Sequence, residues 1–195
     1  SCSHTPHLTI TPTQVPEVVN GIEINKVMSV INNINADANN GKWQFRSTNQ
    51  WTGATKNQSE FKDYLSNNGK NNSHPKPFVL EADEPLILGG TSNAANPVEY
   101  LLHALTSCLT TSLVAHAAVR GITVEDINTS TEGDIDVRGF LGISEEVRNG
   151  YQAIRINMKV KSEASAEQLK ELAMFSPVYD TVSNSLPVDL VIEKH

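Results

Sequence analysis

The stretch "NPVEYLLHALTSCLTTSLVAHAAVRG", residues 96–121, decides the fold because it predicts one long apolar helix near the middle of the chain. Asn96 is a good N-cap and Pro97 suits the first helical position. Glu99 complements the positive end of the helix dipole, and an Arg-Gly pair closes the other end. We therefore predict a helix over residues 97–120.

The uncharged run over residues 100–119 is about as long as a bilayer-spanning helix. Its composition argues against a membrane span, because it contains five serine and threonine side chains and two histidines: Thr106, Ser107, Thr110, Thr111, Ser112, His103 and His116. We interpret it instead as the buried helix of a soluble core.

The composition bounds the domain organisation and the partners. A chain of 195 residues with 38% hydrophobic content suits one core, so we expect a single domain over residues 21–195 behind a loosely ordered N-terminal arm, residues 1–20. The net charge of −7 argues against nucleic acid and anionic membranes as partners. No secretory signal pattern is visible, and we expect a cytoplasmic protein.

The segments before the long helix predict one helix and a small sheet. Apolar residues at helical spacing predict an amphipathic helix over residues 22–37. Alternation over residues 42–53 predicts a strand, and residues 54–62 would complete a hairpin. The Asn-, Gly- and Pro-rich residues 66–77 predict an exposed loop, followed by a short strand over residues 78–83.

The segments after the long helix predict a second set of strands and helices. Residues 123–137 and 151–162 alternate as strands, and residues 165–175 and 176–186 predict helices. Residues 187–193, "PVDLVIE", predict a closing strand. This order of elements is α+β rather than alternating βαβ units.

Cys108 has two interpretations when the helix is considered alone. A cysteine on a buried helix is more often a small packing residue than a working thiol, and it lies too far from the N-cap for the helix dipole to lower its pKa. Thr111 and Ser112 share its face and could donate to a thiolate. His103 and His116 are badly placed for a direct Cys–His pair within this helix.

The other cysteine does not suggest a cofactor site. Cys2 lies near His4 and His7, a spacing that resembles a metal-ligand cluster but lacks a fourth ligand. No phosphate loop, dinucleotide fingerprint or nucleophile elbow is present in the sequence. We therefore expect neither a metal nor another cofactor.

Four motifs together resemble the OsmC/Ohr family of organic hydroperoxide reductases over residues 42–193. They are "GG…NPVEYLLHALTSCL…AAVRGI", "EGDIDVRGFLG", "GYQAIRINMKV" and "FSPVYDTVSNSLPVDLVI". The resemblance implies an OsmC-like α+β fold, with antiparallel sheets wrapped around central buried helices. It also implies an intertwined homodimer with active sites at the subunit interface.

The resemblance also implies a chemistry. Cys108 matches the peroxidatic cysteine, whose thiolate attacks an alkyl hydroperoxide and becomes a sulfenic acid. In the family a second cysteine resolves this acid as a disulfide, while an arginine and a glutamate activate the thiol. Small organic hydroperoxides and a thiol reductant are the implied partners.

Three positions depart from the family pattern. Val98 occupies the place of the usual glutamate, and Glu99 follows one position later, turned by about 100° on the helix. Ser176 stands at the resolving-cysteine position, where "SP" also suits a helix N-cap followed by proline. Arg46 is the only arginine before Cys108, so it is the candidate activator.

The sequence therefore predicts a divergent OsmC-like protein that reduces organic hydroperoxides through a single cysteine, Cys108, and an external thiol. Arg46 and Glu99 are the candidate activating residues. The alternative is a catalytically weak or inactive dimer that binds a small hydrophobic ligand at the subunit interface.

Overall fold

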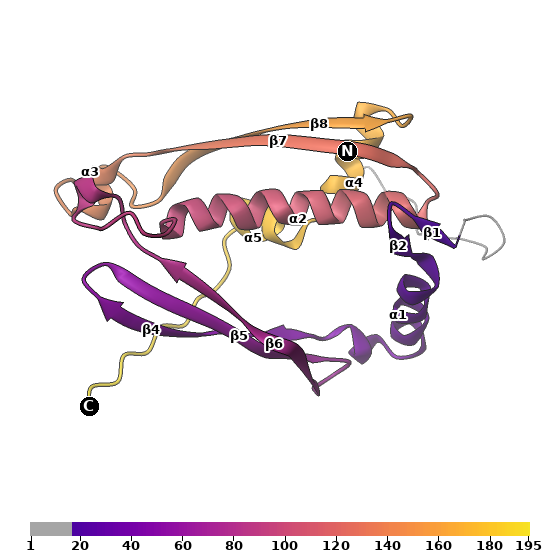
Figure 1. The fold of residues 1–195 in the computed structure, drawn as a ribbon, viewed down its shortest axis with the longest axis horizontal. Helices are drawn as coiled ribbons and strands as arrows, with labels where there is room; N and C mark the ends of the chain where they lie inside the picture. Colours follow the sequence, from indigo (N-terminus) through magenta and orange to yellow (C-terminus); the bar gives the residue numbers. More distant parts are fainter. Residues whose placement is uncertain (1–16) are drawn as a thin grey trace. The chain divides into compact units, whose positions relative to one another are not determined.

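The computed structural model describes residues 17–195 and contains two compact units. Unit 1 comprises Leu102–His195 together with residues up to Ile22, and unit 2 comprises Glu23–Leu101. Most of the predicted arm, with Cys2, His4 and His7, lies outside the described residues. Figure 1 shows the order of the elements along the chain.

Unit 2 begins with the predicted amphipathic helix and continues into an antiparallel sheet. Helix α1 spans Ile24–Ala36 and is followed by a 3-10 turn, η1, at Ala38–Gly41. The strands are β3 (Gln44–Phe45), β4 (Thr48–Gly53), β5 (Lys56–Ser66) and β6 (Lys70–Ala82). Strand β5 pairs with β6 on one side and with β3 and β4 on the other. The predicted β4–β5 hairpin is confirmed.

The predicted loop over residues 66–77 is wrong, because most of it belongs to β6. The turn is confined to Asn67, Asn68 and Gly69, whose φ angles are 45°, 59° and 101°. The two prolines that suggested a loop, at positions 75 and 77, lie where the pairing of β5 with β6 shifts register. Strand β6 is an edge strand, where a residue without an N–H group is tolerated.

Asp83 organises the loop that leads from β6 to the long helix. Its carboxylate is 1% exposed and accepts hydrogen bonds from Thr55 Oγ1 at 2.7 Å, the Glu84 N–H at 2.7 Å and the Asn93 N–H at 3.2 Å. The Thr91 hydroxyl also donates to it. These hydrogen bonds, that of Thr91 first, hold the pKa of Asp83 well below its usual range.

The same loop requires a glycine at position 90. A Cβ atom there would lie 1.9 Å from the Glu84 carbonyl oxygen, which no side chain can accommodate. A short 3-10 turn, η2, at Leu86–Leu88 completes the loop. The segment before the long helix is therefore a fixed structure, although its composition suggested only a series of turns.

Unit 1 contains most of the long helix and the second pair of strands. Helix α2 spans Pro97–Val119, and the antiparallel strands β7 (Val124–Ile135) and β8 (Tyr151–Ser162) form a hairpin beside it (Figure 1). The connection carries a helical turn, α3 (Val137–Phe140), and the hairpin is followed by α4 (Ala166–Ala173) and α5 (Pro177–Ser183). The sequence predicted α2, β7, β8, α4 and α5 correctly.

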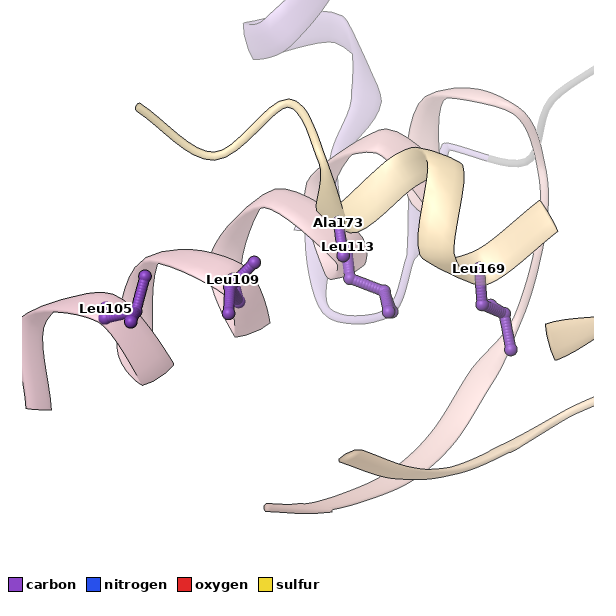
Figure 2. Close-up of a cluster of buried hydrophobic side chains, with 5 residues drawn as sticks. All are labelled: Leu105, Leu109, Leu113, Leu169 and Ala173. Atoms are coloured by element: carbon purple, nitrogen blue, oxygen red, sulfur yellow. The ribbon is translucent and has the colours of Figure 1, made fainter. Parts of the chain in front are cut away.

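The core of unit 1 lies between α2, the hairpin and α4. Its buried cluster comprises Leu105, Leu109 and Leu113 of α2 with Leu169 and Ala173 of α4, as Figure 2 shows. The three leucines recur every four residues and so form one ridge along the helix. Inward-facing residues of β8, which alternate with exposed polar ones, pack against this ridge.

A small hairpin ties the beginning of unit 1 to the far end of α2. Strands β1 (Val18–Val19) and β2 (Ile22–Glu23) turn at Asn20 and Gly21, both with positive φ. The Asn20 side-chain amide donates to the Ile122 carbonyl at 3.0 Å, and its oxygen accepts from the Val124 N–H at 2.7 Å. Asn20 therefore closes the corner between α2 and β7.

The predicted closing strand is absent, since residues 184–195 form neither helix nor strand. Leu186, Val188, Leu190 and Ile192 alternate along this segment and are 54%, 83%, 82% and 81% exposed. The pattern is that of a strand with one apolar face, but no neighbouring strand within residues 17–195 pairs with it.

Helix α2 is the one helix within residues 17–195 that is long and apolar enough to cross a membrane, with a mean hydropathy of 1.3. The core helix of a soluble protein can have the same length and composition. Its leucine ridge packs against α4 and the β7–β8 hairpin, as expected of such a core helix.

We predict that Asp83→Asn lowers the thermal stability of unit 2 at neutral pH, because an amide nitrogen cannot accept the hydrogen bonds that the carboxylate accepts. The lowered pKa means that this stabilisation is present above the usual carboxyl pKa of 3.8 and is lost as the pH falls below it. The difference in melting temperature between wild type and variant should therefore be constant between about pH 7 and pH 5 and should shrink as the pH falls below 3.8. Equal melting temperatures at neutral pH would contradict this role.

Candidate functional site

Glu99 forms hydrogen bonds with Asn96 at the start of α2. Its backbone N–H donates to Asn96 Oδ1 at 2.9 Å, while its carboxylate accepts from the Asn96 N–H at 3.1 Å. This reciprocal pair is a capping box, and it fixes the first turn of the helix. Cys108 lies nine residues further along, about 13 Å by helical rise, so Glu99 does not reach the thiol of its own chain.

Cys108 is a free, half-buried thiol in the middle of α2. The preceding hydroxyls have other partners: Ser107 Oγ donates to the Ala104 carbonyl at 3.2 Å, and Thr106 Oγ1 lies 2.5 Å from Thr131 Oγ1 of β7. Among the described residues of unit 1 none forms a hydrogen bond with Cys108 Sγ, and this includes Ser112 on the same face. These residues therefore do not hold the half-buried Cys108 side chain in place by a hydrogen bond.

Arg46 belongs to unit 2, whereas Cys108 belongs to unit 1. Its Nε donates to Asp63 Oδ1 at 2.7 Å, and its Nη2 donates to Asn71 Oδ1 at 3.5 Å. The hydrogen bond from Arg46 lowers the pKa of Asp63. Within unit 2, Arg46 therefore forms an ion pair with Asp63 of β5.

Ser176 is the N-cap of α5. It is 1% exposed, and its Oγ accepts a hydrogen bond from the Tyr179 N–H at 3.1 Å, which caps α5. Pro177 follows at the first helical position, as the sequence indicated. A hydroxyl cannot form a disulfide, so this position cannot resolve a sulfenic acid on Cys108.

A second group of polar side chains continues from Cys108 along α2. Ser112, His116 and Arg120 follow it at intervals of four residues and so lie along one ridge of the helix. Arg120 Nη1 donates to the His116 carbonyl at 2.9 Å and lies 3.1 Å from His116 Nδ1. Since a guanidinium only donates, Nδ1 accepts and the imidazole proton is on Nε2.

This polar ridge connects α2 with the segment that carries Ser176. The His116 ring stacks on Phe175 with centroids 4.1 Å apart and an interplanar angle of 14°, and Arg120 Cζ lies 5.9 Å from the Phe175 centroid. Burial, and then the charge of Arg120, lowers the pKa of His116, so the imidazole is neutral near pH 7. The sequence analysis did not identify this cluster, and the four-residue spacing was its only visible signal.

The chemistry available in unit 1 is therefore that of a thiol. Within residues 17–195 no group of three or more His, Cys, Asp or Glu side chains could hold a metal ion. Cys108 offers a nucleophilic sulfur, and the neutral His116 and cationic Arg120 lie at least two helical turns away, about 12 to 18 Å along the axis. The fold and site define an α+β protein with one candidate nucleophile, a cysteine on its central helix.

The comparisons with known proteins agree with this definition. The family model described as OsmC-like protein matches residues 90–191, a segment that includes both Cys108 and Ser176. The chain belongs to this OsmC-like family. No curated protein sequence matches it.

Solved structures share the fold at low sequence identity. An OsmC-like protein from Mycoplasma pneumoniae is 16% identical with a TM-score of 0.52, and the match covers 73% of this chain and 89% of that one. A protein from Psychrobacter arcticus, described as an osmotic stress induced and detoxification response protein, is 14% identical with a TM-score of 0.50 over 69% and 85% of the two chains. The predicted mixed fold with antiparallel sheets is thus confirmed.

We predict that Ser176→Ala lowers the free energy of unfolding by about 1 kcal/mol, because it removes the N-cap of α5. Chemical denaturation followed by circular dichroism measures this change. Ser130→Ala is the matched control, since Ser130 is exposed on β7 and should change stability little. If the two variants were equally stable, the cap would not contribute as expected.

Proposed function

We propose that this protein reduces organic hydroperoxides through Cys108 and an external thiol. The observation that carries the proposal is the position of Cys108: it is the one cysteine within residues 17–195, it lies in the segment that matches the family, and it is half-buried with an unbonded sulfur. A thiol in this state can meet a small apolar substrate without first breaking a hydrogen bond. Family membership supports a general role of this kind in defence against oxidative stress.

The reaction takes place in two steps. The Cys108 thiolate attacks the distal, hydroxyl-bearing oxygen of ROOH, the O–O bond breaks, and the alkoxide takes a proton to leave as ROH while the sulfur becomes a sulfenic acid. Two equivalents of an external thiol then reduce the sulfenic acid, giving the free Cys108 thiol, water and a disulfide of the reductant. Ser176 makes the external thiol necessary, since it cannot supply a resolving sulfur.

Neither candidate activating residue of the same chain is free to lower the pKa of the thiol. Glu99 is used in a capping box and Arg46 pairs with Asp63 in the other unit. The proposal therefore includes a homodimer, in which a cationic or carboxylate group of a second copy completes the site. In unit 1, His103 is exposed and lies five residues from Cys108 along α2, and the His116–Arg120 pair lies farther along the helix.

The segment over residues 186–192 supports the homodimer. Its alternating apolar residues are 54% to 83% exposed, and a strand with one apolar face gains stability only by pairing and by covering that face. A second copy of the chain offers the edge strands that this chain leaves open, such as β6, β7 and β8. If residues 186–192 paired with an edge strand of the second copy, they would form the closing strand that the sequence predicts.

We predict that Cys108→Ser reduces consumption of cumene hydroperoxide, in the presence of a dithiol, to the rate without protein. Wild type should also form a sulfenic acid that dimedone traps at Cys108, as mass spectrometry of the peptide would show. Cys2→Ser is the matched control and should keep full activity, because the proposed route uses one cysteine. Wild type without peroxide loss and without a trapped sulfenic acid would contradict the enzyme proposal and favour a binding role.

We predict that Leu190→Asp converts the dimer into monomers, because it places a charge on the apolar face of residues 186–192. Light scattering coupled to size-exclusion chromatography measures the mass of each species. Val191→Asp is the matched control, since successive side chains of a paired strand would point to opposite faces. A monomeric wild type, or equal effects of the two variants, would contradict the proposed pairing.

A further inference from the structure

Unit 1 contains an apolar cavity that the proposed peroxidase chemistry does not use. The cavity has a volume of about 530 Å³ and lies between α2, β8, α4 and the start of α5. This volume is within the range of about 300 to 1,000 Å³ that small-molecule sites occupy. Cys108 is not among its lining residues, although the adjacent Leu109 is.

The walls of the cavity are built from the core pattern of unit 1. Leu109 and Leu113 come from the α2 leucine ridge, and Met158 and Val160 from the inward face of β8. Alternation along β8 sends its charged side chains to solvent, so this wall is apolar over its whole length. An alkyl chain placed here would lose contact with water without leaving a buried polar group unpaired.

Two polar side chains interrupt the apolar lining. Lys170 of α4 and Tyr179 of α5 are the only residues of the lining with a charged or hydroxyl group. Within residues 17–195 neither the Lys170 ammonium nor the Tyr179 hydroxyl has an ion-pair or hydrogen-bond partner. A lone ammonium and a hydroxyl at the edge of an apolar cavity complement a single anionic head group.

We propose that this cavity binds a single-chain anionic amphiphile, a medium-chain carboxylate, with its alkyl chain between α2 and β8 and its carboxylate at Lys170. The single cation fits one carboxylate better than a multiply charged phosphate. The absence of other polar groups in the lining excludes sugars and nucleotides, which would need several hydrogen bonds. The site does not include Cys108, the residue on which the proposed function rests.

The three methionines of the chain make the site directly observable. Met158 and Met174 line the cavity, whereas Met28 belongs to α1 in unit 2. In Cys108→Ser protein labelled with 13C-methyl methionine, titration with dodecanoate should shift the Met158 and Met174 signals and leave Met28 unchanged. The Cys108→Ser background removes the thiol chemistry, so the result does not depend on the peroxidase proposal.

Variants then identify the head-group contact. Lys170→Met should weaken dodecanoate binding by about five- to tenfold and leave binding of the neutral dodecanol unchanged. Lys159→Met is the matched control, because Lys159 lies on the exposed face of β8 and should change neither affinity. Ala166→Phe, which adds a ring at the wall of the cavity, should weaken binding of both ligands.

Two results would overturn the proposal. One is the absence of saturable shifts at Met158 and Met174 with dodecanoate, or shifts of equal size at Met28. The other is a Lys170→Met protein that remains folded by circular dichroism and binds dodecanoate as tightly as its parent. Lys170 is exposed, so this variant tests the head-group contact without disturbing the core.

Discussion

The fold of unit 1 depends on burial of the leucine ridge of α2. Leu105, Leu109 and Leu113 are 2% to 5% exposed, and each fully buried leucine side chain contributes about 1.5 to 3 kcal/mol relative to exposure. A helix of this composition has no stable alternative in water, so the β7–β8 hairpin and α4 must cover it. The inward-facing residues of the hairpin and the buried residues of α4 provide this cover.

The two ends of α2 are fixed by polar contacts of a different kind. At its start the Asn96–Glu99 capping box and the loop folded on Asp83 determine where the helix begins. Beyond its end the Asn20 side-chain amide joins Ile122, three residues after the helix, to Val124, the first residue of β7. The helix that carries the thiol is therefore fixed in length and in direction, and Cys108 occupies a defined position on it.

The sequence predicted the elements whose signals are local. Periodicity and caps predicted α2, and strict alternation predicted β7 and β8. The loop over residues 66–77 was predicted wrongly, because Asn and Pro were counted as turn residues although an edge strand with a register shift accepts them. Asp83 was missed because two of its partners, Thr55 and Thr91, lie 28 and 8 residues away in the sequence.

In the candidate site, too, some residues could be predicted from the sequence, whereas others are brought together only by the fold. Family spacing identified Cys108 and Ser176, and the structure gives Ser176 the capping role that "SP" had suggested. The cluster of His116, Arg120 and Phe175 could not be derived, since the stacking joins residues 59 positions apart in sequence. The relation between Arg46 and the thiol depends on an assembly that a local sequence pattern does not encode.

Helix α2 carries two ridges with different tasks. The leucines at 105, 109 and 113 hold the core together, whereas Cys108, Ser112, His116 and Arg120 follow a neighbouring ridge. Replacement of the thiol or of the ring at 116 therefore leaves the leucine packing in place. Single substitutions on the second ridge can therefore change the reactivity of this helix without disturbing the packing on the first.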